Sequence, residues 1–243
     1  MILRTLFPVV FALVIGCAET NSQTADFEGN IRGGLASGQI TLTFDDGPTV
    51  HTGKILDSLA KYNLKATFFV TGKNAKRYPR IMERMRDEGH LVANHTVNHL
   101  RMTALSRAQI IKEVGYTHMI IKPYVNDNAY FFRAPYGAWQ YWVGDILNAA
   151  GLDFYVGNIY WDIGGTLTSR YSADWNCWSK KISVYECGQG YLNEIQDRRS
   201  GVVLFHDITS STARMIEYLL PKILDRGFSV VRLDDVPLYK NKM

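Results

Sequence analysis

The feature that most constrains the fold of this chain is a regular alternation of short, apolar, β-rich runs with longer segments of helical periodicity. The expected strands span residues 39–44, 66–70, 91–93, 130–133, 154–160, 202–205 and 228–232. Helical patterns fall between them at residues 53–62, 79–88, 106–114, 139–150 and 210–226. Such alternation predicts a parallel sheet with helices outside it, either open or closed into a barrel. About seven strands favour an α/β fold in the form of a distorted (β/α) barrel, with fewer strands than the regular eight.

The N-terminal residues differ in kind from the rest of the chain. Arg4 precedes an apolar stretch, residues 6–16, that is shorter than the roughly 20 residues of a membrane-spanning helix. Residues 14–17, Val-Ile-Gly-Cys, resemble the lipobox of bacterial lipoproteins. The resemblance implies cleavage before Cys17 and lipidation of its sulfur. An ordinary cleaved signal with a chance cysteine is the alternative.

This leader determines the expected domain organisation of the chain and its expected cellular location. We expect a lipoprotein-type signal peptide over residues 1–16, a flexible polar tether over 17–35, and one folded domain over 36–243. Either form of leader implies export. A lipidated Cys17 would anchor the protein in the bacterial cell envelope, facing the periplasm or the cell surface, and would be its only contact with the membrane.

Composition limits the class of partner. With 47% hydrophobic and 21% charged residues, the chain is typical of a globular protein and not of a disordered one. The net charge of +4 is mild, and no run of lysines and arginines indicates a nucleic-acid partner. We expect a monomer.

Two of the three cysteines, Cys177 and Cys187, lie close together in the expected domain. In an oxidising envelope compartment, such a pair predicts a disulfide. Two unlinked buried thiols are the alternative.

Two adjacent aspartates, Asp45 and Asp46, follow the first expected strand and precede a Gly-Pro turn. Adjacent carboxylates at a strand end repel each other, so the pair is tolerable if a cation neutralises one or if one is held as a base. In parallel α/β folds, the C-terminal ends of the strands are where sites are built. Four further polar residues follow expected strands: His95, Arg133, Asp162 and His206.

His95 and His99 complete a candidate metal site. They are four residues apart, so a single helical turn would point both imidazoles the same way. Two neutral imidazoles and one carboxylate match a catalytic divalent metal that keeps positions open for water and substrate.

Four segments carry these residues, in the order Thr43-Phe44-Asp45-Asp46-Gly47-Pro48, His95-Thr96-Val97-Asn98-His99, Arg133-Ala134-Pro135-Tyr136 and Leu204-Phe205-His206-Asp207. In order and spacing they resemble the signature motifs of NodB-like polysaccharide deacetylases, carbohydrate esterase family four. The resemblance extends over residues 38–235, and it implies that the domain over 36–243 is a deacetylase catalytic domain with the distorted barrel fold.

The resemblance implies that Asp46, His95 and His99 bind one divalent metal ion. Zinc is the first choice, with cobalt, nickel and manganese as alternatives. It also implies that Asp45 is the general base that deprotonates the attacking water, and that Arg133 holds Asp45 in place.

The remaining roles follow from the same resemblance. His206 would be the general acid that protonates the leaving amine. The backbone N–H of Tyr136 would bind the oxyanion, with Pro135 beside it in the substrate site. Leu204 would line the pocket for the acetyl methyl group.

One segment departs from the family pattern. The family has an Asp-Trp pair shortly after a strand-end Trp, and its Asp tunes the catalytic His. Here the insertion 163–173 separates Trp161-Asp162 from Asp174-Trp175. We favour Asp174 as the tuning residue and Trp175, with Trp161, as walls of the pocket, and Asp162 is the competing choice.

These observations predict an exported, metal-dependent hydrolase that removes N-acetyl groups from N-acetylglucosamine units of a polysaccharide, such as peptidoglycan or a chitin-like polymer. A metal-dependent cyclic amide hydrolase on the same fold is one alternative. A non-catalytic glycan-binding lipoprotein is the other.

Ser58 and Lys61 form the Ser-x-x-Lys pattern of penicillin-interacting serine enzymes. The companion motifs are absent from the sequence and the pair lies on an expected helix, so we interpret it as a chance match.

Overall fold

The core of the molecule is a parallel sheet of five strands, seen in a computed structural model that describes residues 29–165 and 172–243. The predicted signal peptide and Cys17 lie outside these residues. The sheet order is β3 (Leu91–Asn94), β2 (Thr67–Val70), β1 (Gln39–Asp45) and β4 (Gly201–His206), and β5 (Ser229–Val230) pairs with the start of β1. Every pairing is parallel, as the alternation of strands and helices predicts.

Isolated bridges continue the pairing beyond β3 and return it to β4. Asn94 of β3 pairs with Phe132, Phe131 pairs with Val156, and Ile163 pairs with Val203 of β4. The α/β fold is therefore a distorted barrel.

The expected number of strands was too high for the described residues. The segments 130–133 and 154–160 form single bridges in place of strands. Here Asn158 Oδ1 accepts a hydrogen bond from the backbone N–H of Ala134 at 2.7 Å. This side-chain bond lies just beyond segment 130–133, in which the backbone of Phe132 still bonds to Val156 and Ile159.

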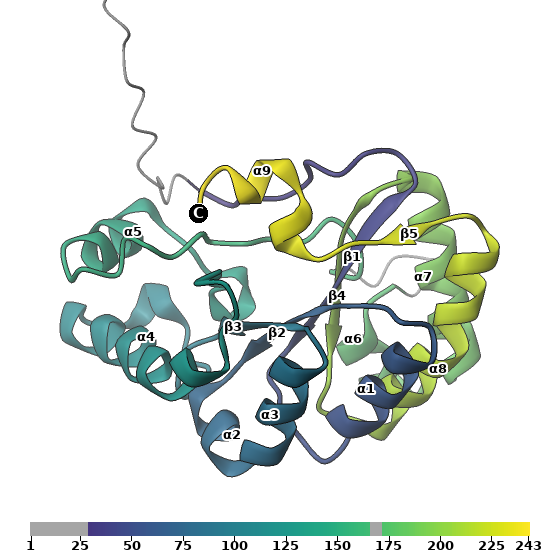
Figure 1. Ribbon diagram of the computed structural model, residues 1–243, viewed down its shortest axis with the longest axis horizontal. Helices are drawn as coiled ribbons and strands as arrows, with labels where there is room; N and C mark the ends of the chain where they lie inside the picture. The colour runs from purple at the N-terminus through teal and green to yellow at the C-terminus, as the bar shows by residue number, and fades with distance from the viewer. Residues whose placement is uncertain (1–28, 166–171) are drawn as a thin grey trace, which may run out of the picture.

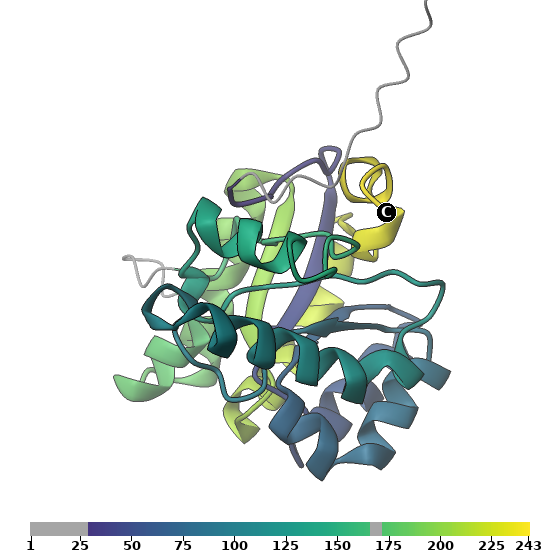
Figure 2. The same ribbon diagram turned by 90° about the vertical axis from the view of Figure 1, so that its left-hand side faces the viewer.

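Helices surround the sheet (Figure 1). Five match predicted segments: α1 (Thr52–Lys61), α3 (Pro79–Asp87), α4 (Arg107–Ile121), α5 (Tyr141–Asn148) and α8 (Ser210–Asp225). Four were not predicted: α2 (Gly72–Arg77), α6 (Asp174–Ser179), α7 (Val184–Arg198) and α9 (Pro237–Lys240). Single 3₁₀ turns lie at Met102–Ala104, Lys122–Tyr124, Pro135–Gly137 and Leu233–Asp235. Figure 2 shows α4 and α5, in teal, in front of the strands.

Helix α7 carried a readable signal in the sequence. Ser183 Oγ accepts a hydrogen bond from the backbone N–H of Glu186, and the Glu186 carboxylate accepts one from the backbone N–H of Ser183. The same reciprocal box at Ser106 and Gln109 marks the start of α4, as predicted. Because Cys187, Tyr191 and Ile195 recur every fourth residue and are buried, α7 also has a regular apolar face.

Stacked aromatic rings pack against one another on neighbouring strands of the barrel. The Phe44 ring on β1 lies 5.0 Å from that of Phe68 on β2 and 5.5 Å from that of Phe205 on β4, measured between centroids. All three side chains are fully buried. Their burial fixes β1 between its neighbours, and so fixes the position of its last residue, Asp45, and of Asp46, which follows it.

The described part of the predicted tether, residues 29–35, lies against the domain. Ile31 forms a parallel bridge with Ile159, and its N–H donates to Asn158 O at 2.8 Å. The Tyr239 hydroxyl donates to Gly33 O at 3.1 Å. These contacts extend the folded domain to an earlier residue than the expected 36, because the backbone groups of this segment find partners on the barrel.

Cys177 on α6 and Cys187 on α7 form a disulfide, with their Cα atoms 6.1 Å apart. Both cysteines are fully buried. The bond joins the two helices that follow the insertion 163–173. None of the helices in residues 29–165 and 172–243 is long and apolar enough to cross a membrane.

Candidate metal centre and active site

The site begins at the C-terminal end of β1, where the two adjacent aspartates take different directions. Asp45 has extended β backbone and is buried, whereas Asp46 has a φ of 76° in the left-handed region. The Asn74 side-chain amide donates to Asp46 O at 2.7 Å and stabilises this conformation. The change of backbone conformation separates the two carboxylates.

Asp46, His95 and His99 converge as predicted. Their ligand atoms all lie within 4.8 Å of one another. Asp46 Oδ1 is 3.4 Å from His95 Nε2 and 3.1 Å from His99 Nε2. The structure therefore brings together the three predicted metal ligands, from the residue that follows β1 and from the loop that follows β3.

The expected helical turn between the two histidines is wrong. Residues 95–99 form a loop, in which Thr96 and His99 have positive φ angles of 65° and 57°. The carboxylate of Glu113 on α4 holds this loop, because its Oε2 accepts the backbone N–H groups of Val97 and Asn98 at 2.9 and 2.8 Å. Two residues with left-handed backbone conformation, and not one turn of a helix, bring the two imidazoles together.

Two observations show that these residues fit a divalent cation. Asp46 Oδ1 is buried and receives no well-formed hydrogen bond from the described residues, although it faces two imidazole nitrogens. His95 Nδ1–H donates to Arg133 O at 2.8 Å, which leaves Nε2 as the unprotonated nitrogen of the neutral ring. The donor set of one carboxylate and two imidazoles suits zinc and related metals.

The charges of the cluster shift the pKa of each of its members, and that of His95 is raised, because the lowering by burial is outweighed by Asp45 and Asp46. Burial raises the pKa of Asp46, but the neighbouring His95, His206 and His99 lower it further, so it falls well below its ordinary value. Burial lowers the pKa of His99, so its ring is held neutral, as a metal ligand must be.

Arg133 holds Asp45. The guanidinium is fully buried, and its Nη1 donates to Asp45 Oδ1 at 2.7 Å and to Thr43 Oγ1 at 2.9 Å. Its Nε donates to Ile159 O at 3.0 Å, and its Cζ lies 4.1 Å from the centroid of the Phe69 ring. The second oxygen, Asp45 Oδ2, lies 3.8 Å from His95 Nε2 and so faces the metal cluster.

His206, at the end of β4, is paired with Asp174. His206 Nδ1–H donates to Asp174 Oδ1, and the His206 backbone N–H donates to Oδ2, both at 2.8 Å. Asp174 is fully buried at the start of α6. Burial alone would lower the pKa of His206, but Asp174 first, and then Asp46 and Asp45, raise it to about 9.

The competing aspartate, Asp162, lies elsewhere. Its Oδ2 accepts the backbone N–H groups of Val202 at 2.9 Å and Gly33 at 3.2 Å, so its hydrogen bonds join the N-terminal segment to β4. The structure brings Asp174 to His206, as we favoured, and not Asp162.

These groups face a cavity of about 530 Å³. Tyr136, Trp161, Trp175 and Leu204 line it together with Asp45, Asp46, His95, His99 and His206. The Trp161 ring stacks on Tyr160 with centroids 4.0 Å apart, whereas Trp175 is 51% exposed at the rim. Pro135 is buried in the short turn before Tyr136 and is not among the residues that line the cavity, and its expected contact with substrate stays a prediction.

Tyr136 is the fourth residue of the site in a left-handed backbone conformation, with a φ of 61°. Its ring lies 4.6 Å from that of His99, between centroids. Strained backbone of this kind concentrates at functional sites. The role of its N–H in binding an oxyanion stays a prediction, as do the roles assigned to the other residues.

Sequence reasoning missed the residues that support the pair His206–Asp174. Thr212 Oγ1 donates to Asp174 Oδ2 at 3.0 Å and accepts from Trp178 Nε1 at 3.0 Å. The Tyr191 hydroxyl accepts from the Asp174 backbone N–H at 3.0 Å and donates to Leu204 O at 2.9 Å. These side chains come from α6, α7 and α8, and no local pattern marks them as neighbours.

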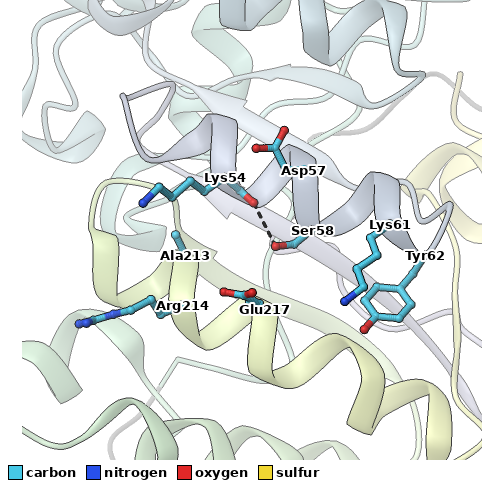
Figure 3. A pocket seen from close by; sticks show the side chains of 8 residues that line it. All are labelled: Lys54, Asp57, Ser58, Lys61, Tyr62, Ala213, Arg214 and Glu217. Atoms are coloured by element: carbon cyan, nitrogen blue, oxygen red, sulfur yellow. Dashed lines mark hydrogen bonds between the residues drawn. The ribbon is translucent and has the colours of Figure 1, made fainter.

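A second hollow, between α1 and α8, contains the Ser-x-x-Lys pair (Figure 3). Ser58 Oγ donates to Lys54 O of its own helix at 3.0 Å, and Lys61 Nζ lies 5.4 Å from the centroid of the Tyr62 ring. Figure 3 shows Ser58 and Lys61 without a contact between them. The geometry gives Ser58 no base, which agrees with a chance match to the motif.

Comparisons with known proteins bear on this site. The sequence pattern that defines the polysaccharide deacetylase family matches residues 33–155. The chain is 32% identical over 204 residues to peptidoglycan-N-acetylmuramic acid deacetylase PdaC of Bacillus subtilis. The aligned residues cover 84% of this chain and 39% of that protein. It is 39% identical over 206 residues to a chitooligosaccharide deacetylase of Rhizobium leguminosarum bv. trifolii, covering 79% and 88% of the two chains.

The fold agrees with these relatives. A solved structure of PdaC from Bacillus subtilis superposes with a TM-score of 0.68 at 30% identity, covering 84% of this chain and 91% of that one. The chain spans well under half the length of several curated relatives that it matches, PdaC among them.

Proposed function

This chain belongs to the polysaccharide deacetylase family, and from that premise we propose that it removes N-acetyl groups from N-acetylglucosamine units of an envelope or extracellular polysaccharide, using one divalent metal ion. One observation carries the proposal. The cluster of Asp46, His95 and His99 and the pair His206–Asp174 line the same cavity, so a metal, a base and an acid can act on one bond.

Asp46, His95 and His99 would hold the metal. When bound there, a divalent cation lowers the pKa of water from 15.7 to about 7 and polarises the acetyl carbonyl. All other steps fall to side chains of this chain.

Asp45 takes the first proton. Arg133 Nη1 holds Asp45 Oδ1, so Oδ2 is directed toward the metal cluster, where it can accept a proton from the attacking water. The water oxygen bonds to the acetyl carbonyl carbon, and the backbone N–H of Tyr136 stabilises the charge that develops on the carbonyl oxygen. Leu204, at the cavity wall, contacts the acetyl methyl group.

His206 completes the reaction. Asp174 holds Nδ1–H, so Nε2–H is the proton that the ring gives to the amine nitrogen as the carbon–nitrogen bond breaks. The products are acetate and a glucosamine unit with a free amine. Because the pKa of His206 is raised to about 9, the ring carries this proton at neutral pH.

Acetate release tests the proposal. Purified protein is incubated with peptidoglycan, chitooligosaccharides and acetylated xylan, each with and without added metal. We expect release from the N-acetylated glycans, loss of release with a strong chelator, and recovery with zinc or cobalt.

Other results would select the alternatives. Glycan binding with no acetate from any polymer would indicate a non-catalytic glycan-binding protein. Turnover of hydantoin-type substrates alone would indicate a cyclic amide hydrolase. We further propose that Cys17 is lipidated and holds the enzyme at the envelope, which mass spectrometry of the protein from membranes of an expressing bacterium would test.

A further inference from the structure

A smaller hollow opens directly beside the catalytic cavity. Its volume is about 330 Å³, and it shares Asp46, His99 and Ile208 with the cavity as lining residues. The two spaces are therefore contiguous at the metal cluster. A glycan with its acetamide group at the metal site therefore lies next to this hollow.

The hollow carries an excess of positive charge. Lys73 and Arg77 line it, and apart from the predicted metal ligands they are the only charged side chains that do so in the described residues. They lie four residues apart on α2, so both extend from one face of that helix.

Lys73 and Arg77 also differ from four surface arginines of this protein that are paired. Arg84, Arg86, Arg198 and Arg232 all form ion pairs with nearby carboxylates. Within residues 29–165 and 172–243, neither Lys73 nor Arg77 has such a partner, and both are exposed. Among the described residues, the only carboxylate that lines the hollow is that of Asp46, a predicted metal ligand, so the two cations favour an anionic ligand.

The helix that presents these cations is attached to the metal-binding loop. The backbone N–H groups of Gly72 and Lys73 donate to Thr96 O at 2.9 Å and Val97 O at 3.2 Å. The Asn74 side chain donates to Asp46 O at 2.7 Å. The position of the two cations is thereby fixed relative to the metal ligands, as a binding subsite requires.

We propose that Lys73 and Arg77 form a subsite for a carboxylate of the substrate, so that the enzyme acts on an acidic N-acetylated glycan in preference to a neutral one. This inference rests on the proposed function and narrows its substrate class. The carboxylate can belong to a lactyl ether on the glycan or to a peptide attached through that ether, and these two sources share the chemistry that the subsite recognises. Aromatic side chains on the cavity wall can pack against the sugar rings of an acidic or a neutral glycan. The preference for one of them therefore depends on the charge of the carboxylate.

The test compares matched substrates and matched variants. The substrates are a tetrasaccharide with free lactyl carboxylates, the same compound with these groups capped as amides, a peptide-bearing form, and neutral chitotetraose. The variants are Lys73→Gln and Arg77→Gln. Lys76→Gln is the control, because Lys76 lies on the same short helix but does not line the hollow.

We expect each test variant to lose about fivefold in kcat/KM on the carboxylate substrates at low salt, mainly through KM. Loss on the capped and neutral substrates should stay under about twofold, and salt should weaken only the carboxylate reactions of the wild type. The control should behave as the wild type. A greater effect on the peptide-bearing form than on the lactyl form would identify the peptide carboxylate as the ligand.

Equal losses on acidic and neutral substrates, or no loss on either, would overturn the subsite. Failure of the proposed function looks different, since the wild type would then release no acetate from any substrate. In that case calorimetric binding of the free and capped tetrasaccharides decides the matter. A preference for the free acid that Lys73→Gln and Arg77→Gln remove supports the subsite, and equal binding refutes it.

Discussion

Replacing Asp174 with asparagine removes the charge that raises the pKa of His206. In the wild type, that pKa is about 9 against an ordinary value of 6.5, and Asp174 is the largest cause of the rise. Burial opposes it, so without the carboxylate we expect the pKa of His206 to fall to 6.5 or below. The substitution keeps the size of the side chain, and the Thr212 hydroxyl can still donate to the amide oxygen.

The magnitude follows from the fraction of protonated ring. At pH 8, His206 is about 90% protonated with a pKa of about 9, but only about 3% protonated with a pKa of 6.5. If His206 is the general acid, kcat at pH 8 should fall about 30-fold through this effect alone. At pH 6 the same calculation gives a fall of less than about twofold. The variant should thus lose activity at alkaline pH and recover much of it in acid.

The assay is the pH dependence of kcat for acetate release, measured on metal-loaded enzyme. The wild type should lose activity as pH rises through about 9, whereas Asp174→Asn should already lose it as pH rises through about 6.5. Asp162→Asn is the matched control, because Asp162 contacts Gly33 and Val202 and should leave the alkaline limb where it is. An unchanged alkaline limb in Asp174→Asn would refute the assignment of the acid.

Two further substitutions test other parts of the site. Asp46→Asn should weaken zinc binding strongly, whereas Asp45→Asn should retain zinc and lose acetate release. Metal analysis of the purified variants, together with the activity assay, would distinguish these effects. Equal loss of zinc in both variants would contradict the division of roles. The double variant Cys177→Ser/Cys187→Ser should unfold with a free energy lower by about 2–3 kcal/mol, seen as a Tm lower by several degrees on calorimetry; an unchanged Tm would show that the disulfide contributes nothing.

Much of the fold was predictable because the signals were local. Short β-rich runs and helical periodicity placed β1 to β5 and five of the helices, and the capping box at Ser106 marked the start of α4. The segments 130–133 and 154–160 were overestimated as strands, since their pairing is limited to isolated bridges. Helix α7 was missed although Ser183 and Glu186 form the same kind of box.

The candidate site divides in the same way. Asp45, Asp46 and His206 could be grouped from the sequence, because parallel strands end at the same edge of a sheet, and β1 and β4 do so with Asp45 paired to His206. The geometry between His95 and His99 could not, because two left-handed residues in the loop replace the expected helical turn.

The sequence by itself determined which residues are candidates for the chemistry, since strand ends and ordered motifs are properties of short segments. Only the tertiary structure decided how those residues act on one another. It directed Arg133 to Asp45 across 88 residues, and it brought Asp174, and not Asp162, to His206. It also placed Lys73 and Arg77 beside the metal ligands. These contacts depend on how α2 and α6 pack against the barrel, and that packing minimises a free energy summed over the whole chain.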